Sequence, residues 1–218
     1  VLADEINRAT PKTQSAMLEA MEERQVTVEG ITHDVPRPFM VMATQNPVEY
    51  EGTFPLPEAQ LDRFLLMITL GYPTAEEEMS IIDGQQTSHP IDDLQTVAEA
   101  EEVTRLQETV RQVYVDDLIK QYIVSLVEAT RNHADISLGS SPRGSLALFR
   151  GARAIALLRD REFALPDDVK ELAVSVLSHR IIVSAAARMR GIGAREVISG
   201  IVDSVAVPGA QARDQYRR

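Results

Sequence analysis

The chain has 218 residues, 44% of them hydrophobic, which is typical of a globular protein, and no apolar run approaches the roughly 20 residues that span a membrane. Its net charge of −11 and isoelectric point near 4.9 argue against nucleic acid as a partner, because phosphates need a basic face. The absence of cysteine excludes disulfides, thiolate metal sites and cysteine nucleophiles, and it fits a cytoplasmic protein.

The chain divides into two regions with different patterns. Residues 1–73 mix strand-like and helical stretches, whereas residues 74–208 show helical apolar periodicity almost throughout. Residues 209–218 form a polar tail that we expect to fray. These patterns predict an α/β domain followed by an all-helical domain.

The N-terminal region opens with the apolar stretch Val1–Asp4, which we interpret as the end of a buried strand. Thr10 and Pro11 then predict a helix that runs to about Arg24, because a capping hydroxyl followed by proline favours a helix start.

Three further stretches of this region have strand patterns. Residues 25–30 and 31–36 alternate apolar and polar residues around Gly30, which predicts a β-hairpin. Residues 39–44 and 63–70 are continuous apolar runs of strand length. Such runs are typical of strands buried on both faces of a parallel sheet.

Helix-start signals recur in the C-terminal region. Thr74 and Glu77 match a capping box, in which each residue satisfies an amide of the other, and this predicts a helix to about Gln86. Ser141 and Pro142 repeat the start seen at Thr10. Further helices are expected over residues 100–111, 116–132, 142–160, 167–188 (with a break near His179) and 194–205.

Two adjacent carboxylates, Asp4 and Glu5, directly follow the first apolar stretch. Magnesium-assisted phosphoryl transfer uses such a pair, in which one acid holds Mg²⁺ and its neighbour orients and deprotonates an attacking water. The alternative is a pair of acids that caps a helix after the strand. Both interpretations stay open on this dipeptide alone.

The segment VLADEINRA resembles the Walker B region of the MoxR family of AAA+ ATPases. The resemblance continues through TPKTQSAMLEAMEERQVTVEG, ATQNPVEYEGTFPLPEAQLDRF and GSSPRG, in the family's order. It implies the C-terminal part of an α/β P-loop NTPase core of the AAA+ type over residues 1–73. An all-α lid domain over residues 74–208 would follow.

The resemblance also implies roles for three polar residues near strand ends. Asp4 corresponds to the Walker B acid that holds Mg²⁺ through water, and Glu5 corresponds to the catalytic base. Asn46 resembles sensor 1, which helps to place the attacking water. Ligands of open α/β sheets bind at the carboxyl ends of strands, where Asp4 and Asn46 are expected. Asn46 could alternatively be a turn residue before Pro47.

Two arginines resemble residues that contact nucleotide phosphates. Arg63 corresponds to the arginine finger, which reaches a neighbouring subunit's nucleotide, and Arg143 corresponds to sensor 2. Arg143 falls in the first turn of a predicted helix, where free amides already favour an anion. The alternatives are surface ion pairs, of Arg63 with Asp62 or Glu58, and of Arg143 with a nearby acid.

For the whole protein, the resemblance implies an ATP hydrolase that uses ATP and Mg²⁺ and assembles as a homo-oligomeric ring, a hexamer as in relatives. Its role would be chaperone-like maturation or activation of client proteins, including ones with von Willebrand factor A-type domains. The hairpin around Gly30 corresponds to one that faces the central pore of related rings. It is either a contact surface for clients or a plain connection.

A Walker A loop, G-x-x-x-x-G-K-[ST], does not occur in these residues. The three lysines are Lys12, Lys120 and Lys170, and none follows a glycine. We therefore expect the chain to begin in mid-strand, after an absent part of the ATPase core, and we expect these residues alone to be inactive toward ATP.

Two other functions fit parts of the sequence. One is an ATPase subunit of a magnesium-chelatase-like complex, or a relative of replicative helicases, against which the acidic charge weighs. The other is a non-catalytic helical interaction module in which the polar residues above are structural. A zinc site is not expected, because the four histidines show no paired ligand spacing.

Overall fold

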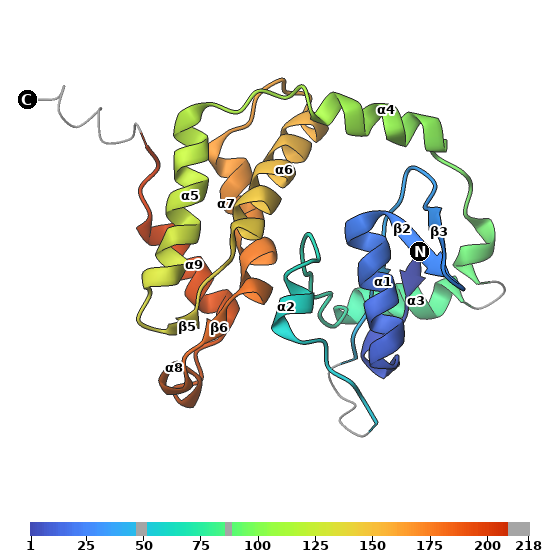
Figure 1. Ribbon diagram of the computed structural model, residues 1–218, viewed down its shortest axis with the longest axis horizontal. Helices are drawn as coiled ribbons and strands as arrows, with labels where there is room; N and C mark the ends of the chain where they lie inside the picture. Colours follow the sequence, from blue (N-terminus) through green and yellow to red (C-terminus); the bar gives the residue numbers. More distant parts are fainter. Residues whose placement is uncertain (47–51, 86–88, 209–218) are drawn as a thin grey trace, which may run out of the picture.

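The computed structural model of the chain describes residues 1–46, 52–85 and 89–208. Figure 1 shows an N-terminal lobe and a helical lobe, with helix α4 (Ala100–Val110) leading from the first to the second. No helix in the described part has the length and apolar content of a membrane span. The predicted polar tail, residues 209–218, lies outside the described residues.

A parallel pair of short strands lies in the N-terminal lobe. β1 (Leu2–Ala3) pairs with β4 (Met42–Ala43), so strands do occur within the predicted stretches 1–4 and 39–44, over two residues each. Their predicted burial is wrong, since Leu2 is 65% exposed and Met42 is 56% exposed. Among the described residues, no further strand joins this pair.

The prediction of a strand at residues 63–70 is wrong. This stretch follows the short helix α2 (Glu58–Leu61) and has no strand partner among the described residues. The Met67 amide donates instead to the Ser175 carbonyl over 2.9 Å, near the end of α7 (Pro166–Leu177). The last carbonyls of a helix lack hydrogen-bond donors within the helix, and the Met67 amide supplies a donor to one of them.

Helix α1 (Pro11–Glu23) begins where the sequence predicts. The Thr10 side chain accepts a hydrogen bond from the third residue of the helix, and Pro11 occupies the first position. Leu18 packs against Ile6 and Leu56, and these three side chains form the buried core of the N-terminal lobe. This core is small, so polar contacts contribute strongly to the arrangement of the lobe.

The predicted hairpin is confirmed. β2 (Gln25–Val28) and β3 (Ile31–Asp34) pair antiparallel, and two residues, Glu29 and Gly30, connect them. Their φ angles of 52° and 81° are both positive, which matches the twist that a two-residue hairpin turn requires.

The predicted capping box is also confirmed, at the start of α3 (Ala75–Gly84). The Thr74 amide donates to Glu77 Oε2 over 2.8 Å, and the Glu77 amide donates to the Thr74 hydroxyl over 3.3 Å. Neither α3 nor α4 has a buried side chain among the described residues.

The helical lobe contains α5 (Asp117–Asn132), α6 (Pro142–Leu158), α7 and α9 (Ala194–Ser204) (Figure 1). The predicted helices are confirmed at these places. α6 and α7 lie close together at Gly151, where an added Cβ would stand 2.5 Å from a Leu172 methyl. The largest fully buried apolar side chains here are Tyr122, Leu126, Leu148, Leu177, Ile198 and Ile201.

The predicted helix over residues 167–188 breaks near His179, as expected, but the residues beyond the break form other elements. The β-branched run at Ile181–Val183 favours extended backbone, and β6 (Ile182–Val183) pairs with β5 (Ile136–Leu138). The other short elements are η1 (Ile6–Arg8), η2 (Pro90–Asp93), η3 (Ser178–Arg180) and α8 (Ala185–Met189).

Candidate functional site

Asp4 lies at the carboxyl end of β1, and the residue after β4 holds its carboxylate. The Thr44 hydroxyl donates to Asp4 Oδ1 over 2.6 Å and accepts from the Glu5 amide over 2.8 Å. One hydroxyl reaches both groups because the carboxyl ends of parallel strands meet at one edge. Asp4 is exposed, so its carboxylate is both fixed and open to solvent.

Glu5 occupies a left-handed backbone conformation, with φ at 49°. This conformation costs on the order of 1 kcal/mol in a residue other than glycine. Hydrogen bonds to Thr44 hold it on both sides, from the Glu5 amide and from the Ile6 amide, which donates to the Thr44 carbonyl over 3.0 Å. The half-buried Glu5 carboxylate lies 3.7 Å from Arg8 Nη1, a weak, solvent-exposed ion pair.

Asn46 lies at the same strand ends and is fixed through Asn7. The Asn7 side chain is buried, and its Nδ2 donates to the Asn46 backbone carbonyl over 3.3 Å. Asn7 Oδ1 is also buried and has no hydrogen-bond partner among the described residues. The alternative turn at Asn46 involves Pro47, which lies outside the described residues.

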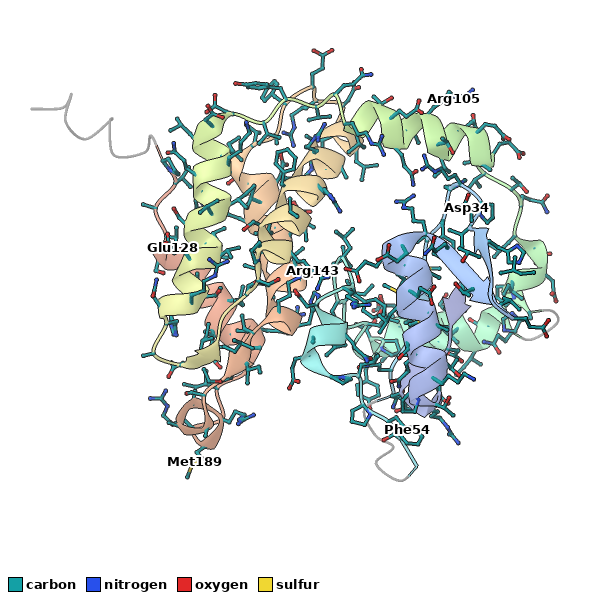
Figure 2. All side chains as sticks on the ribbon, viewed as in Figure 1. Asp34, Phe54, Arg105, Glu128, Arg143 and Met189 are labelled. Atoms are coloured by element: carbon teal, nitrogen blue, oxygen red, sulfur yellow. The ribbon has the colours of Figure 1, made fainter. Side chains whose placement is uncertain are left out.

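The two predicted phosphate-binding arginines meet on one carboxylate. Glu22, in the last turn of α1, has Oε2 3.1 Å from Arg63 Nη1, and its Oε1 pairs with Arg143 Nη2. Figure 2 shows Arg143 between the helical lobe and the helices of the N-terminal lobe. As predicted, Arg143 stands in the first turn of α6, where its amide donates to the Ser141 cap over 3.2 Å.

Asp62 is a second acidic residue beside these arginines. Its carboxylate lies 3.6 Å from Arg143 Nη1 and 3.1 Å from Arg180 Nε, and it accepts from the Ser141 hydroxyl over 2.8 Å. Arg180 also donates to the backbone carbonyls of Asp62 over 3.2 Å, of Leu65 over 3.1 Å, and of Phe64. The helical lobe therefore holds the backbone on both sides of Arg63.

Burial changes the pKa of two neighbouring groups in η3. Burial lowers the pKa of Arg180, and nearby Asp62 partly offsets this effect. Burial, followed by the adjacent Arg180 charge, lowers the pKa of His179 to about 4. His179 is consequently neutral at pH 7, which avoids a second buried cation beside Arg180.

The structure thus arranges the five predicted residues in two groups. Asp4, Glu5 and Asn46 stand at the ends of β1 and β4, while Arg63 and Arg143 share Glu22. Both groups border the small core, against which Ala3, Ala43, Met21 and Phe64 pack.

Sequence reasoning missed four supporting residues: Asn7, Thr44, Glu22 and Arg180. Thr44 ends an apolar strand run, and a hydroxyl at a strand end could have indicated a residue that supports the site. Glu22 and Arg180 carry no local signal, because their partners depend on how the lobes pack. The carboxylate partner of Arg63 is Glu22, whereas the sequence had suggested Asp62 or Glu58.

The residues at the strand ends suit Mg²⁺ that keeps several water ligands better than they suit a metal ion bound entirely by protein side chains. No cluster of three or more His, Cys, Asp or Glu residues that could hold a metal occurs in the described part of the chain. Mg²⁺ usually keeps several waters and binds one or two carboxylates together with substrate phosphates. The fixed, exposed carboxylate of Asp4 fits that mode of binding.

Two family models match the chain. Residues 1–66 match the ATPase family associated with various cellular activities (AAA), and residues 128–201 match the AAA lid domain. The first match contains four of the predicted site residues, and the second contains Arg143.

Curated relatives match almost the whole chain. It is 53% identical to uncharacterized protein YeaC of Bacillus subtilis over 95% of its length, and 42% identical to chaperone MoxR1 of Mycobacterium tuberculosis over 99%. A protein MoxR of Paracoccus denitrificans is 32% identical over 84% of the chain. The chain spans 65%, 59% and 59% of these three proteins, respectively.

Solved structures give the same fold. A candidate ATPase from Cytophaga hutchinsonii superposes with a TM-score of 0.87 at 38% identity, over 94% of this chain and 65% of that one. A full-length MCM homologue from Methanopyrus kandleri superposes with a TM-score of 0.54 at 20% identity, over 83% of this chain and 38% of that one, and supports the fold alone.

Proposed function

Because the chain belongs to the MoxR family of AAA+ ATPases, we propose that it supplies the Walker B, sensor and lid residues of a site that hydrolyses ATP. Hydrolysis would drive chaperone-like maturation or activation of partner proteins. The observation that carries the proposal is the Thr44 hydroxyl, which fixes the Asp4 carboxylate and the Glu5 backbone at the carboxyl ends of two parallel strands.

Each residue of the first group has a role in this proposal. Asp4 would hold Mg²⁺ through water, and the metal ion would neutralise charge on the phosphates. Glu5 orients and deprotonates the attacking water, since its pair with Arg8 is weak enough to release the carboxylate. Asn46 helps to place that water, and Asn7 fixes the Asn46 backbone.

The two arginines would bind phosphate oxygens, because guanidinium groups match phosphate geometry with paired hydrogen bonds. Arg143 would do so from the lid. Arg63 would complete the site of a neighbouring subunit in a ring, a hexamer in this proposal, where an arginine finger contributes roughly 10³–10⁵ in rate.

Partner contact is proposed at the hairpin of β2 and β3. The residues of β3 are exposed, and beside the turn Val28 is 54% exposed and Ile31 is 62% exposed. Client proteins with von Willebrand factor A-type domains are one proposed class. The MoxR names of the relatives favour this function over a magnesium-chelatase-like subunit.

The test is ATP hydrolysis by a designed fusion. A AAA+ phosphate-binding segment with a Gly-Lys-Ser/Thr loop is joined ahead of Val1, because these 218 residues contain no such loop. We expect the fusion to hydrolyse ATP and the 218 residues alone to show no turnover.

Within the fusion, Glu5→Gln should lower the rate by about 10²–10⁴, as expected for loss of a general base. Glu23→Gln is the matched control, because this exposed acid lies outside both groups. An unchanged rate in Glu5→Gln would contradict the assigned base, and turnover by the 218 residues alone would contradict the need for the loop.

A further inference from the structure

Glu22 links three segments of the chain through the two predicted phosphate-binding arginines. It lies in the last turn of α1, Arg63 follows α2, and Arg143 lies in the first turn of α6. Each carboxylate oxygen of Glu22 faces one arginine, with Oε2 3.1 Å from Arg63 and Oε1 paired with Arg143. A single carboxylate is therefore ion-paired with both arginines.

The two acids of this group differ in their other contacts. Asp62 is bound by Arg180 and by the Ser141 hydroxyl, so it keeps partners if Arg143 moves away. Glu22 pairs with Arg63 and Arg143 alone among the described residues. Loss of Glu22 would remove the acidic partner of Arg63 and leave Arg143 with Asp62, whose carboxylate lies 3.6 Å from Arg143 Nη1. Asp62 itself belongs to the fixed structure.

Exposure makes the Glu22 pairs exchangeable. The side chains of Glu22, Arg63 and Arg143 are 35%, 36% and 46% exposed, whereas that of Arg180 is 2% exposed. Ion pairs at such exposure contribute little free energy. A triphosphate carries more charge than one carboxylate and offers more oxygens to the guanidinium groups.

We propose that Glu22 holds Arg63 and Arg143 in the absence of nucleotide and that a triphosphate displaces it. This inference rests on the proposed function, because it takes the two arginines as phosphate ligands. Displacement opens the link between α1 and α6, so phosphate binding at Arg143 is coupled to release of Arg63 and to movement of the lid.

The test is a titration of the 218-residue chain with inorganic tripolyphosphate at constant ionic strength. NMR signals of the Arg63 and Arg143 side-chain Nε–Hε groups report binding at these two residues. In Glu22→Gln, we expect half-saturation at about five-fold lower concentration, because two exposed ion pairs no longer compete. Glu23→Gln removes the same charge one residue away and should match the unmodified chain.

Each other outcome has a defined meaning. If both bind and Glu22→Gln binds no more tightly than Glu23→Gln, then Glu22 does not compete with phosphate and the inference is wrong. If neither binds, the arginines are not phosphate ligands, and the inference falls together with that part of the proposed function. If an Arg63→Ala, Arg143→Ala double variant binds as tightly as the unmodified chain, the phosphate assignment in the proposed function fails instead. Circular dichroism checks that each variant retains its helices.

Discussion

The two lobes of this molecule differ in what holds them together. The helical lobe has one continuous core that includes fully buried Leu126, Leu148 and Ile198. Among the described residues, the N-terminal lobe has a core of three buried side chains, two two-stranded sheets and a set of polar contacts. The predicted chemistry lies in the N-terminal lobe and at its border with the helical lobe. This arrangement places stability and chemistry in different parts of the chain.

The largest expected effect comes from the core of the helical lobe. Leu148→Ala should lower the free energy of unfolding by about 4 kcal/mol, because it leaves a cavity where the side chain is fully buried. Urea unfolding followed by circular dichroism measures this change. Leu158→Ala, on the same helix but 85% exposed, should change stability by less than about 0.5 kcal/mol. Equal losses in both variants would show that α6 does not pack as described.

The second effect concerns a buried carboxylate of α7 that binds an arginine in the connection after α6. Asp168 is fully buried, and Arg161 donates to its two oxygens over 2.9 and 2.5 Å. Burial raises the pKa of this carboxyl, but hydrogen bonds from Arg161 and the Leu165 amide outweigh that effect and lower the pKa overall. The carboxylate is therefore ionised in the folded protein.

Asp168→Asn should consequently destabilise the helical lobe by about 3 kcal/mol, because it removes one partner of a buried charge pair. Asp167→Asn changes an exposed acid in the same turn and serves as the control. Thermal unfolding distinguishes the two variants. A tolerated Asp168→Asn would mean that Arg161 and Asp168 contribute little to the packing of α6 against α7.

The third effect is the pH dependence of the free energy of unfolding that His179, at the border between the lobes, should cause. His179 is neutral in the fold because its pKa is lowered to about 4 from 6.5. The unfolded chain binds the extra proton between these values, so the stability contribution is complete above pH 6.5 and is lost as pH falls toward 4. Between pH 7 and pH 5 the loss should be about 2 kcal/mol.

His179→Gln should remove most of that pH dependence, since glutamine stays neutral throughout the range. Urea unfolding at pH 7, 6 and 5 gives the slope for each protein. A slope that is the same with and without His179 would show that this side chain is accessible to protons in the folded state.

The sequence predicted the helical lobe more closely than the N-terminal lobe. The capping signal at Ser141 acts within a few residues, and apolar periodicity marks the buried face of a helix, so both can be read locally. Extended segments depend on partners far away in the chain. The apolar run at 63–70 therefore predicted a strand, although its amide at Met67 bonds to α7.

The candidate site shows the same division. The family resemblance implies the roles of Asp4, Glu5 and Asn46, and the apolar runs before Asp4 and Asn46 predict their places at strand ends. Their positions at the ends of β1 and β4 follow from strand pairing. Glu22 could not be predicted, because its partners Arg63 and Arg143 are brought to α1 by the packing of the two lobes.

The most direct test of the account asks whether Asp4 and Asn46 of one group and Arg143 of the other surround the same nucleotide. In the fusion that carries a phosphate-binding segment, Mn²⁺ replaces Mg²⁺ as a paramagnetic probe bound with ATP, and NMR line broadening reports proximity to it. We predict that the backbone signals of Asp4 and Asn46 and the side-chain signal of Arg143 broaden together, and that Asp4→Asn weakens all three effects. Broadening confined to one group, with the other unaffected at saturating ATP, would contradict the account.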